Sequence, residues 1–206
     1  ASHYFVEVPG AQPSRRWVAV DCGTVNGEAQ ATSPAGSGKA SSAPSGSKVD
    51  VAGNLYVLAM SWEPAFCEGL PGKAECKAAT PQSFDSTHLS LHGLWPQPRR
   101  RAFCNVDKRM AQADDEHRWD DLPEVKLSPE TRAALDKVMP GTQSVLERHE
   151  WIKHGTCYPG ADAEQYFKDA VRVMSEINAS PVQALLASRI GQKVTGREVR
   201  AVFDQA

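Results

Sequence analysis

The sequence lacks two features that would assign it to common classes of protein. No apolar run approaches the roughly 18 to 20 residues that a membrane-spanning helix needs, and we therefore expect a soluble protein without a membrane partner. The charges nearly balance, with 23 basic and 25 acidic residues, which excludes the global basic field of a protein that binds duplexes regardless of their sequence. Any polyanion must therefore be held locally, by a few well-placed cations.

The five cysteines lack the paired C-x-x-C spacing of a zinc site, and we expect no metal and no cofactor. Disulfides explain these cysteines better and favour a periplasmic or secreted protein. Cys67 and Cys76 flank a short segment with Pro71 and Gly72, a separation that suits a local bridge. The alternative is reduced, buried cysteines in a cytosolic protein. Because the number is odd, at least one cysteine is free, pairs between chains or has lost its partner.

A length of 206 residues suits one domain with a substantial core and is short for two. We expect a single domain over residues 1–206, with a mobile surface loop at about 27–53, where Gly, Ala, Ser and Pro predominate. Arg16–Val20, before the loop, predicts a short strand. The continuous apolar run Leu55–Trp62, after it, predicts a central strand that is covered on both faces.

Alternating polarity predicts a further strand at Thr87–His92. Leu89 and Leu91 would face the core, which turns His92 to the opposite face at the end of the strand. After His92, a glycine and a proline predict a bend into a loop that contains Trp95. We expect Trp95 to contact a substrate from this loop.

Start and stop signals predict helices in the second half of the chain. These helices are expected from Ser128-Pro129 to Pro140-Gly141, from about Gln143 to His154, after Asp162, from Ser180-Pro181 to Gly191, and after a capping box of Thr195 and Glu198. A few strands and several helices, without regular alternation, predict the α+β class.

Several charged and aromatic groups have structural interpretations. We interpret the charge clusters Arg99–Arg101 and Asp114–Glu116 as solvated loops, and His117 as a solvated side chain. His88 is interpreted as structural, and Trp151 as part of the core or of the wall of a site.

The segment His149–Cys157 concentrates acid–base and cationic groups. On a helix with about 100° per residue, His149 and His154 diverge by roughly 140° and cannot form the H-E-x-x-H zinc pair, which needs a spacing of four. This spacing disfavours a zinc protease. Glu150 and His154 are instead neighbours at i, i+4, as are His149 and Lys153. The carboxylate can orient the imidazole, and the lysine adds positive charge for an anion.

Cleavage of RNA without a metal requires the types of group that this segment supplies. A base takes the proton of the 2′-hydroxyl, an acid protonates the departing 5′-oxygen, and cations stabilise the charge on the phosphorane. Together with His92 from the strand end, the segment provides histidines, a lysine and a glutamate for these tasks.

Two segments resemble the active-site segments of the ribonuclease T2 family: His92-Gly-Leu-Trp-Pro96 and His149-Glu-Trp-Ile-Lys-His-Gly-Thr-Cys157. The resemblance extends from about residue 50 to residue 190, and it includes the strand Leu55–Trp62, the cysteine after it and the helices around Val138–Gly141. It implies a ribonuclease T2-like α+β fold, in which an antiparallel central sheet packs against several helices.

The resemblance implies a division of roles among the residues of these segments. His92 would be the general acid and His154 the general base; they would first form a 2′,3′-cyclic phosphate and then, with exchanged roles, hydrolyse it. Glu150 and Lys153 would position and stabilise the pentacoordinate phosphate, and His149 would bind phosphate.

The resemblance also concerns residues outside this acid–base set. It implies that Trp95 stacks on a base, as aromatic platforms for single-stranded RNA do, and that Cys157 is bridged to Cys104. It further implies strands beyond Ala206, so we expect either a shortened form of the fold or a C-terminal fragment that is absent from this chain. Such a fragment could hold a partner for Cys22.

We therefore expect a monomeric, metal-independent endoribonuclease that cleaves single-stranded RNA with low base specificity. The alternative is a catalytically silent module with the ribonuclease fold that binds RNA or protein. Its usual sign is a missing catalytic histidine, whereas both His92 and His154 are present.

Overall fold

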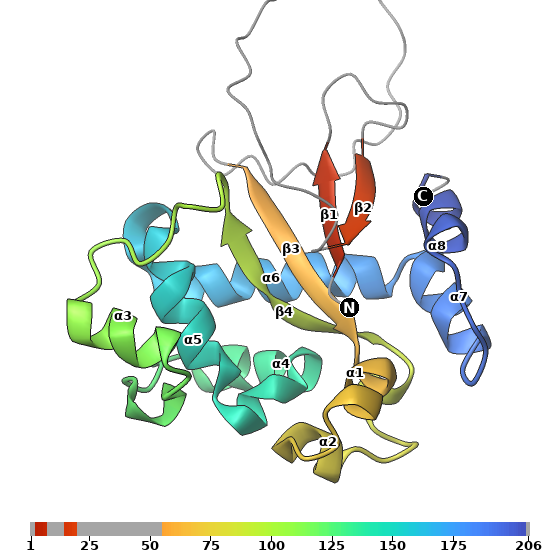
Figure 1. Ribbon diagram of the computed structural model, residues 1–206, viewed down its shortest axis with the longest axis horizontal. Helices are drawn as coiled ribbons and strands as arrows, with labels where there is room; N and C mark the ends of the chain where they lie inside the picture. Colours follow the sequence, from red (N-terminus) through yellow and green to blue (C-terminus); the bar gives the residue numbers. More distant parts are fainter. Residues whose placement is uncertain (1–2, 8–14, 20–54, 205–206) are drawn as a thin grey trace, which may run out of the picture.

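An antiparallel sheet lies at the centre of the protein (Figure 1). The structure is a computed structural model, and it describes residues 3–7, 15–19 and 55–204. The loop predicted at 27–53 and Cys22 lie outside these described residues.

The strands of this sheet are β1 (His3–Glu7), β2 (Arg15–Ala19), β3 (Tyr56–Trp62) and β4 (Leu89–Pro96). Their order across the sheet is β2-β1-β3-β4, and each neighbouring pair is antiparallel. The strands predicted at Arg16–Val20 and Leu55–Trp62 are thus confirmed, with a shift of one residue at their starts.

Helices surround the sheet within the described part of the chain. The α-helices are α1 (Glu63–Gly69), α2 (Ala74–Ala78), α3 (Lys108–Asp115), α4 (Pro129–Val138), α5 (Leu146–Lys153), α6 (Ala163–Asn178), α7 (Pro181–Ser188) and α8 (Gly196–Phe203). Short 3-10 helices are η1 (Phe84–Ser86), η2 (Trp119–Asp121), η3 (Pro140–Ser144), η4 (Gly155–Cys157) and η5 (Pro159–Ala161). Helix α6 runs behind β3 and β4, with α3 to α5 on one side and α7 and α8 on the other (Figure 1). The predicted α+β class is confirmed.

Side-chain caps start the helices at the predicted positions. Ser128 and Ser180 each accept a hydrogen bond from a backbone N–H two or three residues later, before α4 and α7. Asp162 caps α6 in the same way, and Thr195 and Glu198 form the predicted capping box before α8. These caps satisfy N–H groups that have no partner within the helix. Among the described helices, none has both the length and the apolar character needed to cross a membrane.

Two predicted helix boundaries are wrong. The helix predicted from Gln143 to His154 begins only at Leu146, because Val145 has a left-handed backbone with φ of 53° and separates α5 from the 3-10 helix η3. Helix α7 ends at Ser188, three residues before the predicted stop at Gly191. Val145 lies after the predicted start of α5, and α7 ends before its predicted stop, so neither predicted boundary coincides with the end of a helix.

Strand β4 continues through Trp95, which corrects the bend predicted after His92. Leu91 and Gly93 pair with consecutive residues of β3, so that His92 between them is the extra residue of a β-bulge. Without the bulge, Leu94 would share a face with His92. With it, Leu94 enters the core and Trp95 joins His92 at the surface that faces α5.

Helix α6 holds the outer edge of β4. The Tyr166 hydroxyl donates a hydrogen bond to the Leu94 carbonyl at 3.1 Å and accepts one from the Leu94 N–H at 3.2 Å. The Asn178 side chain does the same with Leu89, at 2.9 and 2.8 Å. Tyr166 is completely buried in the main core together with Phe167, which α6 also supplies. These side chains cover the backbone groups that an edge strand would expose.

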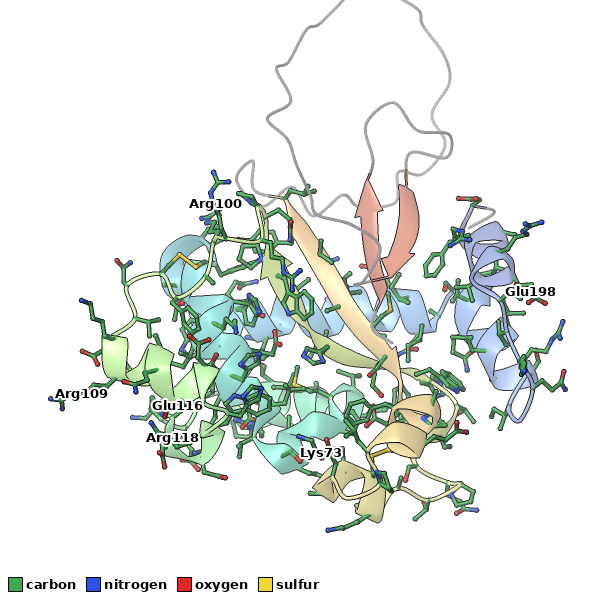
Figure 2. All side chains as sticks on the ribbon, viewed as in Figure 1. Lys73, Arg100, Arg109, Glu116, Arg118 and Glu198 are labelled. Carbon is green, nitrogen blue, oxygen red and sulfur yellow. A yellow bond between two sulfur atoms is a disulfide. The ribbon has the colours of Figure 1, made fainter. Side chains whose placement is uncertain are left out.

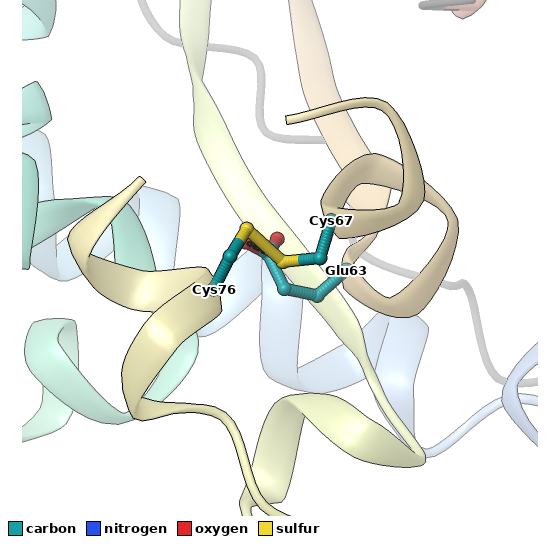
Figure 3. Close-up of side chains that lie close together, drawn as sticks. All are labelled: Glu63, Cys67 and Cys76. Carbon is teal, nitrogen blue, oxygen red and sulfur yellow. Dashed lines mark hydrogen bonds between the residues drawn. A yellow bond between two sulfur atoms is a disulfide. The ribbon is translucent and has the colours of Figure 1, made fainter. Parts of the chain in front are cut away.

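Two disulfides hold the loops around the sheet. Cys67–Cys76 joins α1 to α2 (Figure 3), which confirms the bridge predicted from their spacing. Cys104–Cys157 joins the segment after β4 to η4, which confirms the bridge that the family resemblance implied. The Cys104–Cys157 disulfide thus joins the end of the motif His149–Cys157 to the segment that follows the motif His92–Pro96.

Candidate active site

The two motifs meet where α5 crosses β4. A Cβ atom at Gly93 would overlap the carboxyl group of Glu150, so only glycine lets the helix approach the strand this closely. In the second motif, a Cβ atom at Gly155 would overlap the Trp151 ring. Both motif glycines therefore serve close packing, a role that sequence analysis did not assign.

Glu150 lies at the centre of the site, with a side chain that is 0% exposed. Its Oε2 accepts a hydrogen bond from Trp95 Nε1 at 3.0 Å. Its Oε1 lies 3.3 Å from His92 Nε2 and 3.7 Å from His149 Nε2. The carboxyl group thus contacts residues of both motifs, whereas the helical spacing predicts a pairing with His154.

Burial sets the protonation of Glu150 and His92. It raises the pKa of Glu150 well above its usual range, and the nearby charge of Asp114 adds to this effect. Burial, followed by the positive charges of His149 and Lys73, lowers the pKa of His92 to about 4. Because 39% of the His92 side chain is exposed, water screens part of this effect. Both shifts favour a protonated Glu150 and a neutral His92.

His154 ends α5 and lies against Trp95. The two rings are stacked, with centroids 5.3 Å apart. The His149 ring lies edge-on to the His154 ring, with centroids 6.1 Å apart. Burial, followed by the positive charges of His149 and Lys153, lowers the pKa of His154 to about 3. His154 is therefore a neutral imidazole at neutral pH, the state in which it can accept a proton. Its Nδ1 is buried and has no hydrogen-bond partner among the described residues.

Asp114 is a site residue that sequence analysis missed. The acidic run predicts a solvated loop for Asp114 and its neighbours, but the Asp114 side chain is 0% exposed and lies on α3. Its Oδ1 lies 2.6 Å from His149 Nδ1, and its Oδ2 lies 3.6 Å from Lys153 Nζ. His149 and Lys153, the predicted pair, therefore both interact with the Asp114 carboxylate. One acidic residue within an acidic run gives no signal that distinguishes it from its neighbours.

Trp119 and Lys73 add a wall that sequence analysis also missed. The Trp119 ring stacks on His149 with centroids 4.6 Å apart, and Lys73 Nζ lies 5.6 Å from the centroid of the Trp119 ring. With His92, both residues line a cavity of about 160 Å³. Lys73 lies in the loop closed by the Cys67–Cys76 disulfide, so this bridge also shapes the cavity.

The remaining charged groups only partly follow the prediction. Glu116 and Arg118 form an exposed ion pair at 2.9 Å beyond the end of α3 (Figure 2), as expected of a solvated segment, and His117 between them is exposed. Arg101 differs, because its guanidinium donates a hydrogen bond to the Cys157 carbonyl at 3.2 Å. The interpretation of the cluster Arg99–Arg101 as purely solvated is therefore wrong at its last residue.

Two residues that were interpreted as structural are confirmed. His88 stacks on Phe84 and its Nδ1 lies 2.9 Å from the Phe84 carbonyl oxygen. Trp151 packs against the main core, with its ring centroid 6.0 Å from that of Tyr166. Neither residue belongs to the group of acid–base side chains.

Two groups among the described residues bring potential metal ligands together. His92, His149 and Glu150 each offer a donor atom within 4.8 Å of the others, and so do Glu63, Cys67 and Cys76. The two sulfur atoms of the second group are joined in a disulfide and are not thiolate ligands (Figure 3). In the first group, a bound metal would compete with proton transfer for the same histidine nitrogen atoms.

Comparison with known proteins identifies the family of this chain. A model of the Ribonuclease T2 family matches residues 53–202. Ribonuclease I of Escherichia coli (strain K12) is 36% identical over 172 residues, which cover 72% of this chain and 63% of that protein. Ribonuclease T2 of Homo sapiens is 27% identical over 134 residues, 61% of this chain and 44% of that protein. The chain belongs to the ribonuclease T2 family, and it spans less than two thirds of the length of these relatives.

Proposed function

We propose that this protein is an endoribonuclease that cleaves single-stranded RNA by metal-independent transphosphorylation, through a 2′,3′-cyclic phosphate. The observation that carries this proposal is the placement of two imidazoles against one indole. The ring centroids of His92 and His154 lie 5.5 and 5.3 Å from that of Trp95. An acid and a base that both lie beside the same residue can act on the two oxygens of one phosphodiester.

The first step uses the neutral imidazole of His154 as the base. It takes the proton of the 2′-hydroxyl, the 2′-oxygen attacks phosphorus, and the bond from phosphorus to the 5′-oxygen breaks. His92 gives its proton to the departing 5′-oxygen. In the second step, His92 takes a proton from water, the water oxygen opens the cyclic phosphate, and His154 returns its proton to the 2′-oxygen.

Glu150 supplies the proton that His92 needs. Burial favours the protonated form of this carboxyl group and the neutral form of His92. A bound phosphodiester brings negative charge, which favours the imidazolium form of His92. The proton would pass between Glu150 Oε1 and His92 Nε2, two atoms that lie 3.3 Å apart. His149 and Lys153 would hold the phosphate and stabilise the charge of the phosphorane.

Low base specificity follows from the type of contact that is proposed for the bases. Trp95 is partly exposed and would stack on one base, and Trp119 lines the adjacent cavity. Stacking on an aromatic ring accepts any base, because every base has a π-face. The two disulfides support a periplasmic or secreted location, and we propose that the chain acts as a single-domain monomer.

A matched pair of oligonucleotides tests this function. With a chelator present, the protein should cleave the RNA strand and leave the DNA strand of the same sequence intact, because DNA lacks the 2′-hydroxyl nucleophile. His92→Ala and His154→Ala should each lower the rate by about 100- to 10,000-fold. Cleavage of DNA, or loss of activity with the chelator, would contradict the mechanism. RNA that is bound but not cleaved would favour the catalytically silent module.

A further inference from the structure

Asp114 lies between His149 and Lys153, the two residues that the proposed function assigns to the phosphate. Its carboxylate is completely shielded from solvent, with Oδ1 2.6 Å from His149 Nδ1 and Oδ2 3.6 Å from Lys153 Nζ. Oδ2 has no hydrogen-bond partner in the described part of the chain. A buried carboxylate is costly unless it is paired, and here both neighbours are basic residues of one site.

We propose that Asp114 is a positioning residue for phosphate binding, which sets the tautomer and orientation of His149 and anchors Lys153. This inference rests on the proposed ribonuclease function. The carboxylate accepts the Nδ1–H of His149, so Nε2 is the ring nitrogen that faces the phosphate, and it donates to a phosphate oxygen when the ring is protonated. The Glu150 carboxyl lies 3.7 Å from the same nitrogen. A carboxylate behind a ligand histidine commonly fixes its ring in this way.

The surroundings of Asp114 are built to hold this arrangement. The Trp119 ring covers the face of His149 with an interplanar angle of 25°, and the Trp119 indole N–H donates to the Asp114 carbonyl at 3.3 Å. Asp114 thus controls His149 from both its side chain and its backbone. Asp114 is the next-to-last residue of α3, so its contacts with His149 and Trp119 both form where this helix ends.

A merely structural role would be the attachment of α3 to α5. That role predicts a loss of stability in a variant of Asp114 but no specific change at His149. The neighbour Asp115 provides a matched control, since its Oδ1 also lies 3.6 Å from Lys153 Nζ while its side chain is 64% exposed. Asp115→Asn removes a similar charge from the same helix and leaves the contact of His149 unchanged.

The test compares steady-state cleavage of a ribodinucleotide by the full chain and its variants. Asp114→Asn should lower kcat/KM by about 10- to 100-fold, the range found for outer partners of ligand histidines, while Asp115→Asn should change it by less than about threefold. In a His149→Ala background, Asp114→Asn should cost less than about threefold, because its main target is gone. Equal losses for both aspartate variants, or an undiminished loss in that background, would overturn the proposal.

A readout that is independent of cleavage separates this proposal from the proposed function. Nitrogen NMR of the histidine rings should show His149 protonated at Nδ1 in the wild type at neutral pH, and a changed tautomer population in Asp114→Asn. Circular dichroism verifies that the variant is folded. An unchanged His149 spectrum in a folded variant would refute the positioning role. A wild type that shows the expected spectrum but does not cleave RNA would instead refute the proposed function.

Discussion

The carboxyl group of Glu150 lies directly against the backbone of Gly93. This contact joins the two motifs, because it places the acid–base groups of α5 beside His92 and Trp95 of β4. The close packing of α5 on β4 therefore sets the distance between the histidines of the site, and only glycine at position 93 permits this packing. Glycine in the first motif is as much a part of the site's geometry as the side chains around it.

The contact predicts a strong effect for Gly93→Ala. The new methyl group would displace Glu150 or push α5 away from β4, so we expect a loss of about 1 to 3 kcal/mol in the free energy of unfolding together with loss of RNA cleavage. Urea denaturation and a cleavage assay measure both effects. Gly72→Ala is the matched control, since its Cβ would meet nothing within 4 Å. A Gly93 variant as stable and active as this control would contradict the account.

The low pKa of His154 predicts how activity depends on pH. The profile of kcat/KM reports the free protein, in which the base must be neutral. On the acidic side of the profile, activity therefore falls only when the pH drops through the pKa of His154, which lies at about 3. We expect the acidic limb well below the usual histidine value of about 6.5.

A variant of the neighbouring cation tests the cause of this low pKa. Lys153 is a positive charge that lowers the pKa of His154, although burial is the larger cause. Lys153→Gln should therefore move the acidic limb of the kcat/KM profile upward, in addition to weakening substrate binding. A limb that stays in place or moves downward would show that the limb reports a group other than His154.

Glu63 predicts a stability effect outside the acid–base group. Burial, with the charges of Asp85 and Glu75, raises its pKa to about 7 from 4.5. Below pH 4.5, Glu63 is protonated in both the folded and the unfolded chain. Between pH 4.5 and 7, only the unfolded chain releases the proton, so the folded state loses stability as the pH rises.

Glu63→Gln removes this titration. The variant should be more stable than the wild type at pH 8, on the order of 1 to 3 kcal/mol, and the difference should vanish near pH 4. Thermal unfolding at both pH values measures it. Glu68→Gln, at an exposed position of the same helix, should show no such dependence. A Glu63 variant whose advantage grows towards acidic pH would contradict the assignment.

The two disulfides should differ in their effect on stability. Cys104–Cys157 closes a sequence separation of 53 and Cys67–Cys76 one of 9. In the chain-entropy model, their removal costs about 4 and about 2.5 kcal/mol, respectively. Paired serine variants and calorimetry measure this difference. A larger loss from the shorter loop would show that native contacts around Lys73, rather than loop closure, set the contribution of Cys67–Cys76.

The parts of the fold that follow from local chemistry could be predicted from the sequence. Ser128, Ser180 and Thr195 cap helices through their own neighbouring N–H groups, and the apolar run at 55–62 forms a strand. The bulge at His92 could not be predicted, because it depends on the pairing with β3 rather than on alternation within β4.

The candidate site shows the same division. Motif spacing identified His149, Glu150 and Lys153 as a group, but not their partners in space. Asp114 comes from α3 and is 35 residues from His149 in the sequence, so only the packing of α3 on α5 reveals that it is buried. Trp119 could not be predicted for the same reason, since its contact with His149 depends on the fold of the turn after α3.

The most direct measurement is phosphorus NMR of a ribodinucleotide incubated with the protein and a chelator. The account predicts that a 2′,3′-cyclic phosphate appears first and is then converted to a 3′-phosphate, and that neither signal appears with His154→Ala. A 5′-phosphate product, or a 3′-phosphate without the cyclic intermediate, would contradict transphosphorylation by His92 and His154.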